Sequence, residues 1–230
     1  SSKLVTVSQH SRNDIIRWNP SLVDKLSVIT PGVSEVFRPL EEKEREDVRH
    51  RWGGLQPFLL TVGPAKAHKN LELAVEVLAE VRRTHPNLRL LMVGAVGRGL
   101  RSLHRRAATL GVEDAVVGLG FLRDEYLREL YGAADALLFP SKYEGFGIPP
   151  LEAMACGCPV VASNLTAVPE SVGKAGWLVD PENKEEWVRV VSDVVARARV
   201  KNPTAGRLWA SGFSWDQTAD KLLKIVETAA

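Results

Sequence analysis

The segment DALLFPSKYEGFGIPPLEAMACGCPVVAS, residues 135–163, decides the fold of this chain. Its apolar run at 136–139 is typical of a parallel strand that is buried on both faces. The glycines at 145 and 147 indicate a turn, and the double proline after them predicts the start of a short helix. The final letters, CPVVAS, predict a second buried strand. A strand, a helix and a strand in this order indicate a unit of a parallel α/β sheet.

The turn in this segment has the composition of an anion site. In open α/β sheets, ligands bind at the carboxyl ends of the strands, where loops and helix N-termini converge. Gly145 and Gly147 bracket Phe146, so backbone N–H groups there can come close to an anion. The free N–H groups in the first turn of the following helix also favour a phosphate. We therefore expect a phosphate-and-sugar site at this turn.

Two carboxylates, those of Glu144 and Glu152, flank the turn. The prolines between them rule out one continuous helix, so the two side chains are not stacked on one helical face. We expect Glu144 to project from the turn and Glu152 from the first turn of the helix, so that both border one pocket. A carboxylate can accept hydrogen bonds from two vicinal hydroxyls. The alternative for Glu152 is that it only complements the helix dipole.

The sequence resembles the retaining glycosyltransferases of family 4, which have two facing Rossmann-like domains (the GT-B fold). The resemblance rests on the pattern E-x7-E in EGFGIPPLEAMACGCPVVAS, and extends over VGPAKAHKNLELAVEVL, GFLRDEYLRELYGAADALLFPS and FSWDQTADKLLKIV. It implies that Glu144 contacts the transferred sugar and that Glu152 binds the ribose of the donor nucleotide. It also implies that four backbone amides hold the diphosphate, those of Gly145, Phe146, Gly147 and Ile148.

A second loop, GPAKAHKN, follows another predicted strand and carries two lysines. Lys69 is expected at the start of the next helix, where it would neutralise a diphosphate leaving group. Many members of the resembled family pair this lysine with an arginine, but here the corresponding positions hold Pro64 and His68. Lys66 can supply the second charge; the alternative is that it is a solvated loop charge. The predicted catalytic residues are thus Glu144 and Lys69.

A third loop, VGAVGRGLRSLHRRA, has several glycines after a strand. No acidic residue follows at the distance that a dinucleotide fingerprint requires, so a nicotinamide site is not predicted. The basic residues at 98, 101, 104 and 105 can meet phosphates or an anionic membrane surface, or can form a solvated face. The family resemblance implies that the backbone around Phe121 and Leu122 contacts the base. The alternative for Phe121 is a place in the core.

Strands and helices alternate along the rest of the chain without repeats. This alternation predicts a Rossmann-like parallel sheet with helices on both faces and right-handed crossovers. Trp187 lies among valines at helical spacing and is expected in the core. The shortest helix is expected at 149–156. The predicted strands are 58–62, 88–93, 116–119, 136–139, 160–162 and 177–179.

The resemblance also predicts three parts of the chain. Residues 1–25 are expected to be the tail of a missing N-terminal acceptor domain with its linker. Residues 26–212 are expected to form the nucleotide-sugar-binding domain, whose first strand lies in KLSVITPGVSEVFRPL. Residues 213–230 are expected to form a C-terminal helix that crosses back towards the N-terminal domain.

The composition is that of an enzyme domain with one good core. The chain has 230 residues, of which 45% are hydrophobic and 25% charged, and its net charge of +2 gives no support to nucleic-acid binding. No apolar run approaches the ~20 residues that cross a bilayer. Cys156 and Cys158 suit neither a zinc site nor a redox pair, and the histidines show no ligand spacing. We expect no metal, and a cytoplasmic location or one at the inner face of the membrane.

These observations predict the donor-binding domain of a retaining glycosyltransferase that works without a metal. The expected donor is GDP-mannose first and a UDP-hexose second, as substrate and not as cofactor. The expected acceptor is a carbohydrate, a lipid or a small molecule, held by the missing domain, so that the isolated chain is expected to be inactive. The alternatives are a GT-B-like sugar-nucleotide epimerase or phosphorylase, and a non-catalytic nucleotide-sugar-binding module. No motif for the pyridoxal-phosphate lysine of a phosphorylase is present.

Overall fold

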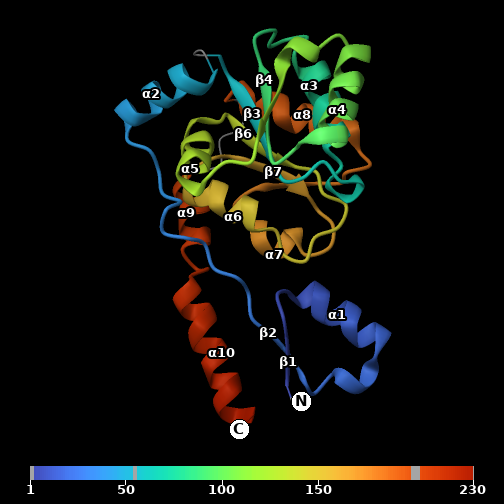
Figure 1. The fold of residues 1–230 in the computed structure, drawn as a ribbon, viewed down its shortest axis with the longest axis vertical. Helices are drawn as coiled ribbons and strands as arrows, with labels where there is room; N and C mark the ends of the chain where they lie inside the picture. The colour runs from blue at the N-terminus through green and yellow to red at the C-terminus, as the bar shows by residue number, and fades with distance from the viewer. Residues whose placement is uncertain (1–2, 54–55, 198–202, 230) are drawn as a thin grey trace.

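The computed structural model describes residues 3–53, 56–197 and 203–229 of the chain, and its main part is a parallel sheet between two layers of helices (Figure 1). The strands are β1 (Leu4–Thr6), β2 (Leu26–Val28), β3 (Phe58–Val62), β4 (Arg89–Val93), β5 (Val116–Gly120), β6 (Ala136–Phe139), β7 (Val160–Ser163) and β8 (Trp177–Val179). The α-helices are α1 (Gln9–Trp18), α2 (Glu42–Gly53), α3 (Leu71–Val81), α4 (Gly97–Thr109), α5 (Asp124–Ala133), α6 (Ile148–Ala155), α7 (Val168–Val172), α8 (Lys184–Val195), α9 (Pro203–Ala210) and α10 (Trp215–Ala229). The 3-10 turns are η1 (Pro20–Leu22), η2 (Ala67–Lys69) and η3 (Glu113–Ala115).

The larger sheet has six parallel strands in the order β5-β4-β3-β6-β7-β8. This is the doubly wound Rossmann order, and it confirms the predicted fold class. The chain enters this sheet at β3, in the middle, and its next strands are added outward to β5. It then returns to β6, beside β3, and adds the remaining strands on the other side. The two strands at the point of return, β3 and β6, are direct neighbours. In sheets of this order, the carboxyl edge of the strands at the point of return is the expected place for a ligand, and we call this edge the crevice.

The four central strands of this sheet, β4, β3, β6 and β7, bury both of their faces, whereas the edge strands β5 and β8 are mostly half-buried. In β6, Leu137 and Phe139 pack into the cluster formed with α5 and α6, whereas Ala136 and Leu138 pack into the cluster formed with α3 and α8. The period of two follows from the strand geometry, and the apolar run that it produces is the signal from which the strand was predicted. Trp187, on α8, is fully buried in the second cluster, as expected.

Two local expectations are wrong. The strand expected at the start of the larger domain is β2, which pairs with β1 in a separate two-stranded sheet. The shortest described α-helix is α7 rather than the helix after the double proline. Together β1, α1 and β2 form what we call the N-terminal unit, residues 3–28, which lies below α7 and beside α10 (Figure 1). The division of the chain at residue 25 stays a prediction.

Two passages of the chain, the one that follows β2 and the one that leads into α10, run side by side and are bonded to each other. The amide of Val33 donates to the carbonyl of Phe213 at 2.9 Å, and the hydroxyl of Thr218 donates to the carbonyl of Thr30 at 2.8 Å. Gly32 makes this approach possible, because a Cβ atom there would lie 2.2 Å from the backbone nitrogen of Trp215.

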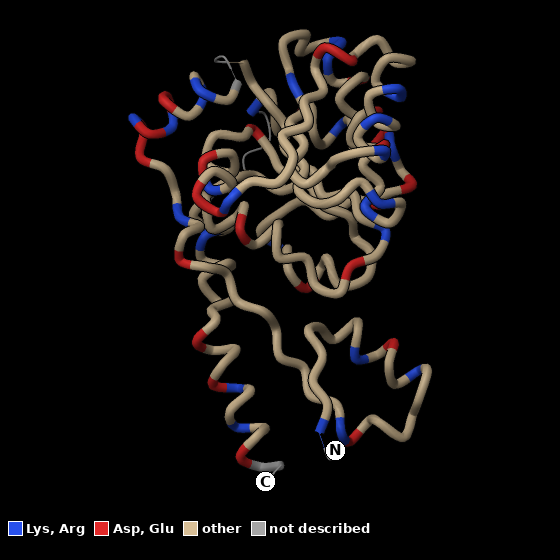
Figure 2. Tube along the Cα trace, in the orientation of Figure 1, with Lys and Arg blue, Asp and Glu red and all other residues tan. Residues whose placement is uncertain are grey.

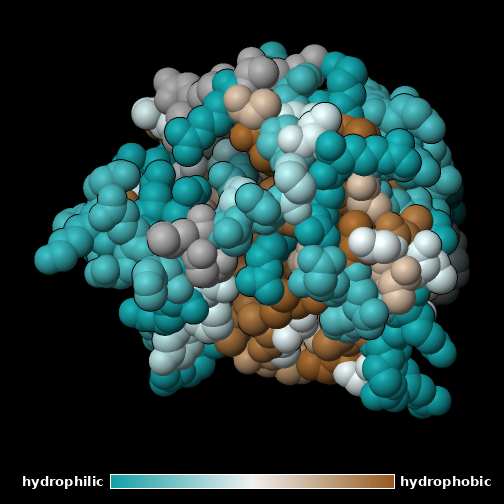
Figure 3. All heavy atoms as spheres, turned by 90° about the horizontal axis from the view of Figure 1, so that it is seen from above, coloured by the Kyte–Doolittle hydropathy of each residue, from teal (hydrophilic) through white to brown (hydrophobic). Residues whose placement is uncertain are grey.

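The surface carries charges of both signs. Acidic and basic residues are interspersed along α2 and α10 (Figure 2). Seen from the end of the molecule opposite α10, the rim is mainly hydrophilic, with hydrophobic residues showing between polar ones (Figure 3). None of the helices in the described ranges is long and apolar enough to cross a membrane.

We predict that Gly32→Ala destabilises the paired passages. The added methyl group has no room against the backbone of Trp215, so Val33 and Phe213 must move apart. The free energy of unfolding should fall by about 1–3 kcal/mol, the usual cost of overpacking, which thermal or denaturant unfolding will measure. Gly206→Ala is the matched control, because its methyl group would make only ordinary contacts 3.4 Å from Met154. Equal stability of the two variants would contradict the prediction.

Candidate functional site

Three loops meet at the crevice between β3 and β6. The amide of Lys142, after β6, donates to the carbonyl of His68 in η2 at 2.7 Å. The amide of Glu144 donates to the hydroxyl of Thr166, after β7, at 3.1 Å. Thr166 adopts a left-handed conformation (φ 53°), which directs its side chain into this contact. The loops after β3, β6 and β7 are thus fixed to one another by hydrogen bonds.

The two predicted catalytic side chains lie in direct contact at this place. Lys69 Nζ donates to Glu144 Oε1 at 2.6 Å, and only 15% and 13% of these side chains are exposed. The ammonium also lies 5.5 Å from the centre of the Phe139 ring, which adds a cation–π attraction. Gly63 lies beside the lysine; a Cβ atom there would make only an ordinary contact 3.6 Å from Lys69 Cε, so the φ of 136°, and not lack of space, favours glycine.

Lys69 lies directly before the start of α3. It is the last residue of η2, and the next residue, Asn70, is the N-cap of α3 and adopts the left-handed conformation (φ 52°). The side chain is held by its contact with Glu144.

The turn after Glu144 presents its backbone to the crevice. Gly147 requires glycine, because its φ is 103° and a Cβ atom would lie 3.0 Å from Ser171 Oγ. Phe146 anchors the turn with a buried ring that packs on Phe213, with ring centres 5.8 Å apart. Four backbone amides of this turn donate no hydrogen bond within the described part of the chain: those of Gly145, Phe146, Gly147 and Ile148. Four such free donors beside a lysine form a cradle for an anion.

Glu152 lies one turn inside α6, not in its first turn as expected. It therefore has no place among the free N–H groups of the helix start, which removes the alternative that it only complements the dipole. The hydroxyl of the fully buried Tyr131 donates to Glu152 Oε2 at 3.0 Å. Burial raises the pKa of Glu152 to about 7; the Tyr131 hydrogen bond opposes this rise and Asp124 adds to it. Burial also raises the pKa of Tyr131.

Glu144 and Glu152 thus meet different partners. Glu144 faces a lysine, whereas Glu152 faces a neutral phenol in an apolar surrounding. A carboxyl group with a pKa of about 7, such as that of Glu152, exchanges a proton near neutral pH. The two carboxyl groups can therefore serve different ligand groups.

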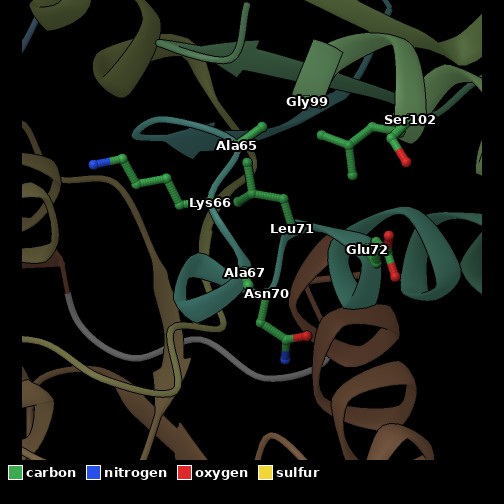
Figure 4. A pocket seen from close by; sticks show the side chains of 9 residues that line it. Ala65, Lys66, Ala67, Asn70, Leu71, Glu72, Gly99 and Ser102 are labelled. Atoms are coloured by element: carbon green, nitrogen blue, oxygen red, sulfur yellow. The ribbon is translucent and has the colours of Figure 1, made fainter.

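Three further residues are predicted to belong to the site: Lys66, Phe121 and Leu122. Lys66 is exposed and its side chain points away from the other labelled residues in Figure 4. Phe121 is 78% exposed after β5, so the alternative that it belongs to the core is wrong. Leu122 is half-buried and packs on the cluster that contains α5 and α6.

A separate hollow of about 290 Å³ lies beside η2, between the N-terminal ends of α3 and α4 (Figure 4). Asn70, Glu72 and Ser102 supply its polar atoms. Neither Glu144 nor Glu152 lines it, so it is distinct from the crevice.

Sequence reasoning missed three residues that hold the site. Thr166 accepts from Glu144, Tyr131 donates to Glu152, and Glu170 contacts α1 across the molecule. Each is far from its partner in the sequence, and none forms a recognisable spacing with it. Only the position of Thr166 just after the predicted strand at 160–162 would have indicated a place at the same edge of the sheet.

Comparisons with known proteins agree with this geometry. Residues 42–208 match the family described as "Glycosyl transferases group 1". The chain is 36% identical over 189 residues to O-antigen chain mannosyltransferase B of Escherichia coli, covering 80% of this chain and 49% of that protein. It is 34% identical over 236 residues to the D-inositol 3-phosphate glycosyltransferase of Segniliparus rotundus, covering 97% and 51%. The chain therefore spans about half the length of these relatives.

Solved structures extend the likeness to the fold. The structure of Anabaena HepE in complex with UDP and glucose superposes with a TM-score of 0.87 at 21% identity, over 99% of this chain and 63% of that one. Sucrose-phosphate synthase of Thermosynechococcus elongatus superposes with a TM-score of 0.81 at 26% identity, over 98% and 57%. Because the family model covers most of the sequence and the fold is that of the C-terminal half of GT-B enzymes, this chain belongs to the group 1 glycosyl transferases.

Proposed function

We propose that this chain is the donor-binding part of a retaining glycosyltransferase that moves a hexose from a nucleoside diphosphate sugar to an acceptor. The contact between Lys69 and Glu144, beside four free backbone amides, carries the proposal. It combines one cation and several N–H donors for a diphosphate with one carboxylate for sugar hydroxyls. Glu152 would accept from the ribose.

The donor would reorganise the ion pair. A diphosphate takes the ammonium of Lys69, which releases the carboxylate of Glu144 for the hydroxyls of the sugar. As the bond between the anomeric carbon and the phosphate oxygen breaks, Lys69 and the turn amides stabilise the charge that develops on the phosphate. The acceptor oxygen forms its bond to the same carbon on the same face, and its proton passes to the departing phosphate. This front-face displacement retains the anomeric configuration.

The similar proteins bear on the identity of the donor. A relative that is named a mannosyltransferase supports GDP-mannose as the first donor, and the UDP and glucose bound by HepE support a UDP-hexose as the second. Lys66 would add charge near the diphosphate, and the backbone at Leu122 would contact the base. The acceptor, a carbohydrate, a lipid or a small molecule, would be held by the other half of the whole protein. The free cysteines support a cytoplasmic location.

We predict that Lys69→Ala weakens the binding of GDP or UDP by about 1.5–3 kcal/mol, the range for hydrogen bonds to charged groups. Calorimetric titration will measure it. The variant also leaves the carboxylate of Glu144 nearly buried without a counter-charge, so a lower melting temperature is expected as well. The double variant Lys69→Ala/Glu144→Gln separates the two effects, because it should recover stability but not affinity. Full affinity in either variant would remove Lys69 from the cradle.

The two glutamates should differ in the ligand group whose binding they support. Glu152→Ala should weaken nucleotide and nucleotide sugar alike, and the unmodified protein should bind 2′-deoxynucleotides poorly. Glu144→Ala should leave the affinity for the bare nucleotide nearly intact and should weaken only the sugar-bearing donor. Titrations of both variants with all three ligands test this. Equal losses for every ligand would leave a general anion site without sugar or ribose recognition.

Nucleotide affinity and protein stability should change in opposite directions with pH. With a folded pKa of about 7, Glu152 binds a proton that the unfolded chain, with an ordinary pKa of 4.5, has lost. The protonated Glu152 therefore contributes fully to the free energy of unfolding below pH 4.5. This contribution, about 1–3 kcal/mol, is lost as the pH rises through 7. Affinity should rise from pH 6 to pH 8, because the carboxylate accepts from both ribose hydroxyls. In Glu152→Gln both trends should flatten, and their persistence would assign them to another group.

A further inference from the structure

The start of α1 is held by a carboxylate from the opposite part of the chain. The amides of Gln9 and His10 donate to the two oxygens of Glu170, each at 2.8 Å. The next amide, that of Ser11, donates to the side chain of Ser8. No acidic residue of α1 lies in its own first turn, so Glu170 supplies the negative charge that a helix N-terminus favours. Glu170 is on α7, and Figure 1 shows α1 directly below that helix.

The same end of α1 touches the turn that carries Glu144. The hydroxyl of Ser11 donates to the carbonyl of Gly145 at 3.3 Å. On the other side of Glu144, the hydroxyl of Tyr143 donates to Asp14 at 3.1 Å. The N-terminal unit therefore contacts both sequence neighbours of the residue that we assign to the sugar.

Helix α7 is fixed to that turn as well. Ser171, the neighbour of Glu170, lies so close to Gly147 that a Cβ atom there would be 3.0 Å from its hydroxyl. The indole N–H of Trp209 donates to the carbonyl of Ser171 at 2.8 Å, which ties α7 to α9. The turn, α7 and α1 thus each contact the other two, and Glu170 makes the contact between the two helices.

Helix α1 has other contacts with the sheet domain, among them the bonds of Ser11 and of Asp14 and the edge-on packing of the His10 ring against Tyr143, with ring centres 6.0 Å apart. The bond from Ser11 is long, and Tyr143 is 52% exposed. Hydrogen bonds from backbone amides to a carboxylate are shorter and roughly twice as strong as neutral ones. Glu170 thus makes two charge-assisted bonds to α1 at 2.8 Å, both shorter than the bonds of Ser11 and Tyr143.

We propose that Glu170 is a positioning residue for the sugar-contacting turn. By holding the start of α1, it fixes the N-terminal unit against residues 143–147, and so sets where Glu144 stands relative to the donor sugar. This inference rests on the proposed role of Glu144. Glu170 itself touches neither the nucleotide nor the sugar.

The test compares Glu170→Ala and Glu170→Gln with the unmodified chain in two measurements. Amide hydrogen exchange by NMR follows Gln9 and His10, and calorimetry compares GDP with GDP-mannose and UDP with UDP-glucose. In Glu170→Ala, exchange at both amides should accelerate at least tenfold. Affinity for the bare nucleotide should stay within twofold, while affinity for the nucleotide sugar should fall at least fivefold. Glu170→Gln should be intermediate, because glutamine keeps one acceptor oxygen.

Glu80→Ala, which breaks an ion pair between α3 and Arg83 just after that helix, is the matched control and should change neither measurement. Faster exchange with unchanged sugar preference would reduce Glu170 to a cap of α1 and overturn the proposal. Unchanged exchange would overturn it too, by removing the link itself. If the unmodified chain prefers no nucleotide sugar over its nucleotide, the function proposed above fails, and positioning fails with it; the exchange data would then still show whether Glu170 holds α1.

Discussion

The order in which the parallel strands are wound is the constraint on which the rest of this structure depends. Because the chain enters this sheet in the middle at β3 and returns beside it at β6, two loops from distant parts of the sequence leave neighbouring strand ends at the same edge. Lys69 and Glu144 lie on these loops, 75 residues apart in the chain and 2.6 Å apart in space. A sheet wound in one direction only would place a crossover helix between them.

The ion pair explains the electrostatic character of the crevice. Its two side chains are largely removed from water, so their attraction is strong and each depends on the other for a counter-charge. A diphosphate carries more negative charge than one carboxylate and can also use the free amides of the turn, so it is the ligand that can displace Glu144 from the lysine. Glu152, held by Tyr131 in apolar surroundings, has no such partner. The proposed function would thus use one side of the site for charge and the other for hydroxyl groups.

The sequence predicts the strands of the larger sheet well, because a strand buried on both faces must be an apolar run and its turns need glycine or proline. It also predicts the place of Glu144 and the turn, which depend on local backbone preference. It fails where distant segments decide the outcome. The pairing of β2 with β1, the exposure of Phe121 and the contact of Glu170 with α1 are set by tertiary packing. No local sequence pattern predicts such long-range contacts.

A crystal structure of the chain with GDP or UDP bound tests the central claim most directly. The account predicts that the β-phosphate lies within hydrogen-bonding distance of Lys69 Nζ and of the amides of residues 145–148, with Glu144 separated from the lysine. A diphosphate bound elsewhere, in the hollow between α3 and α4 or on the arginines of α4, with the contact between Lys69 and Glu144 intact, would contradict it.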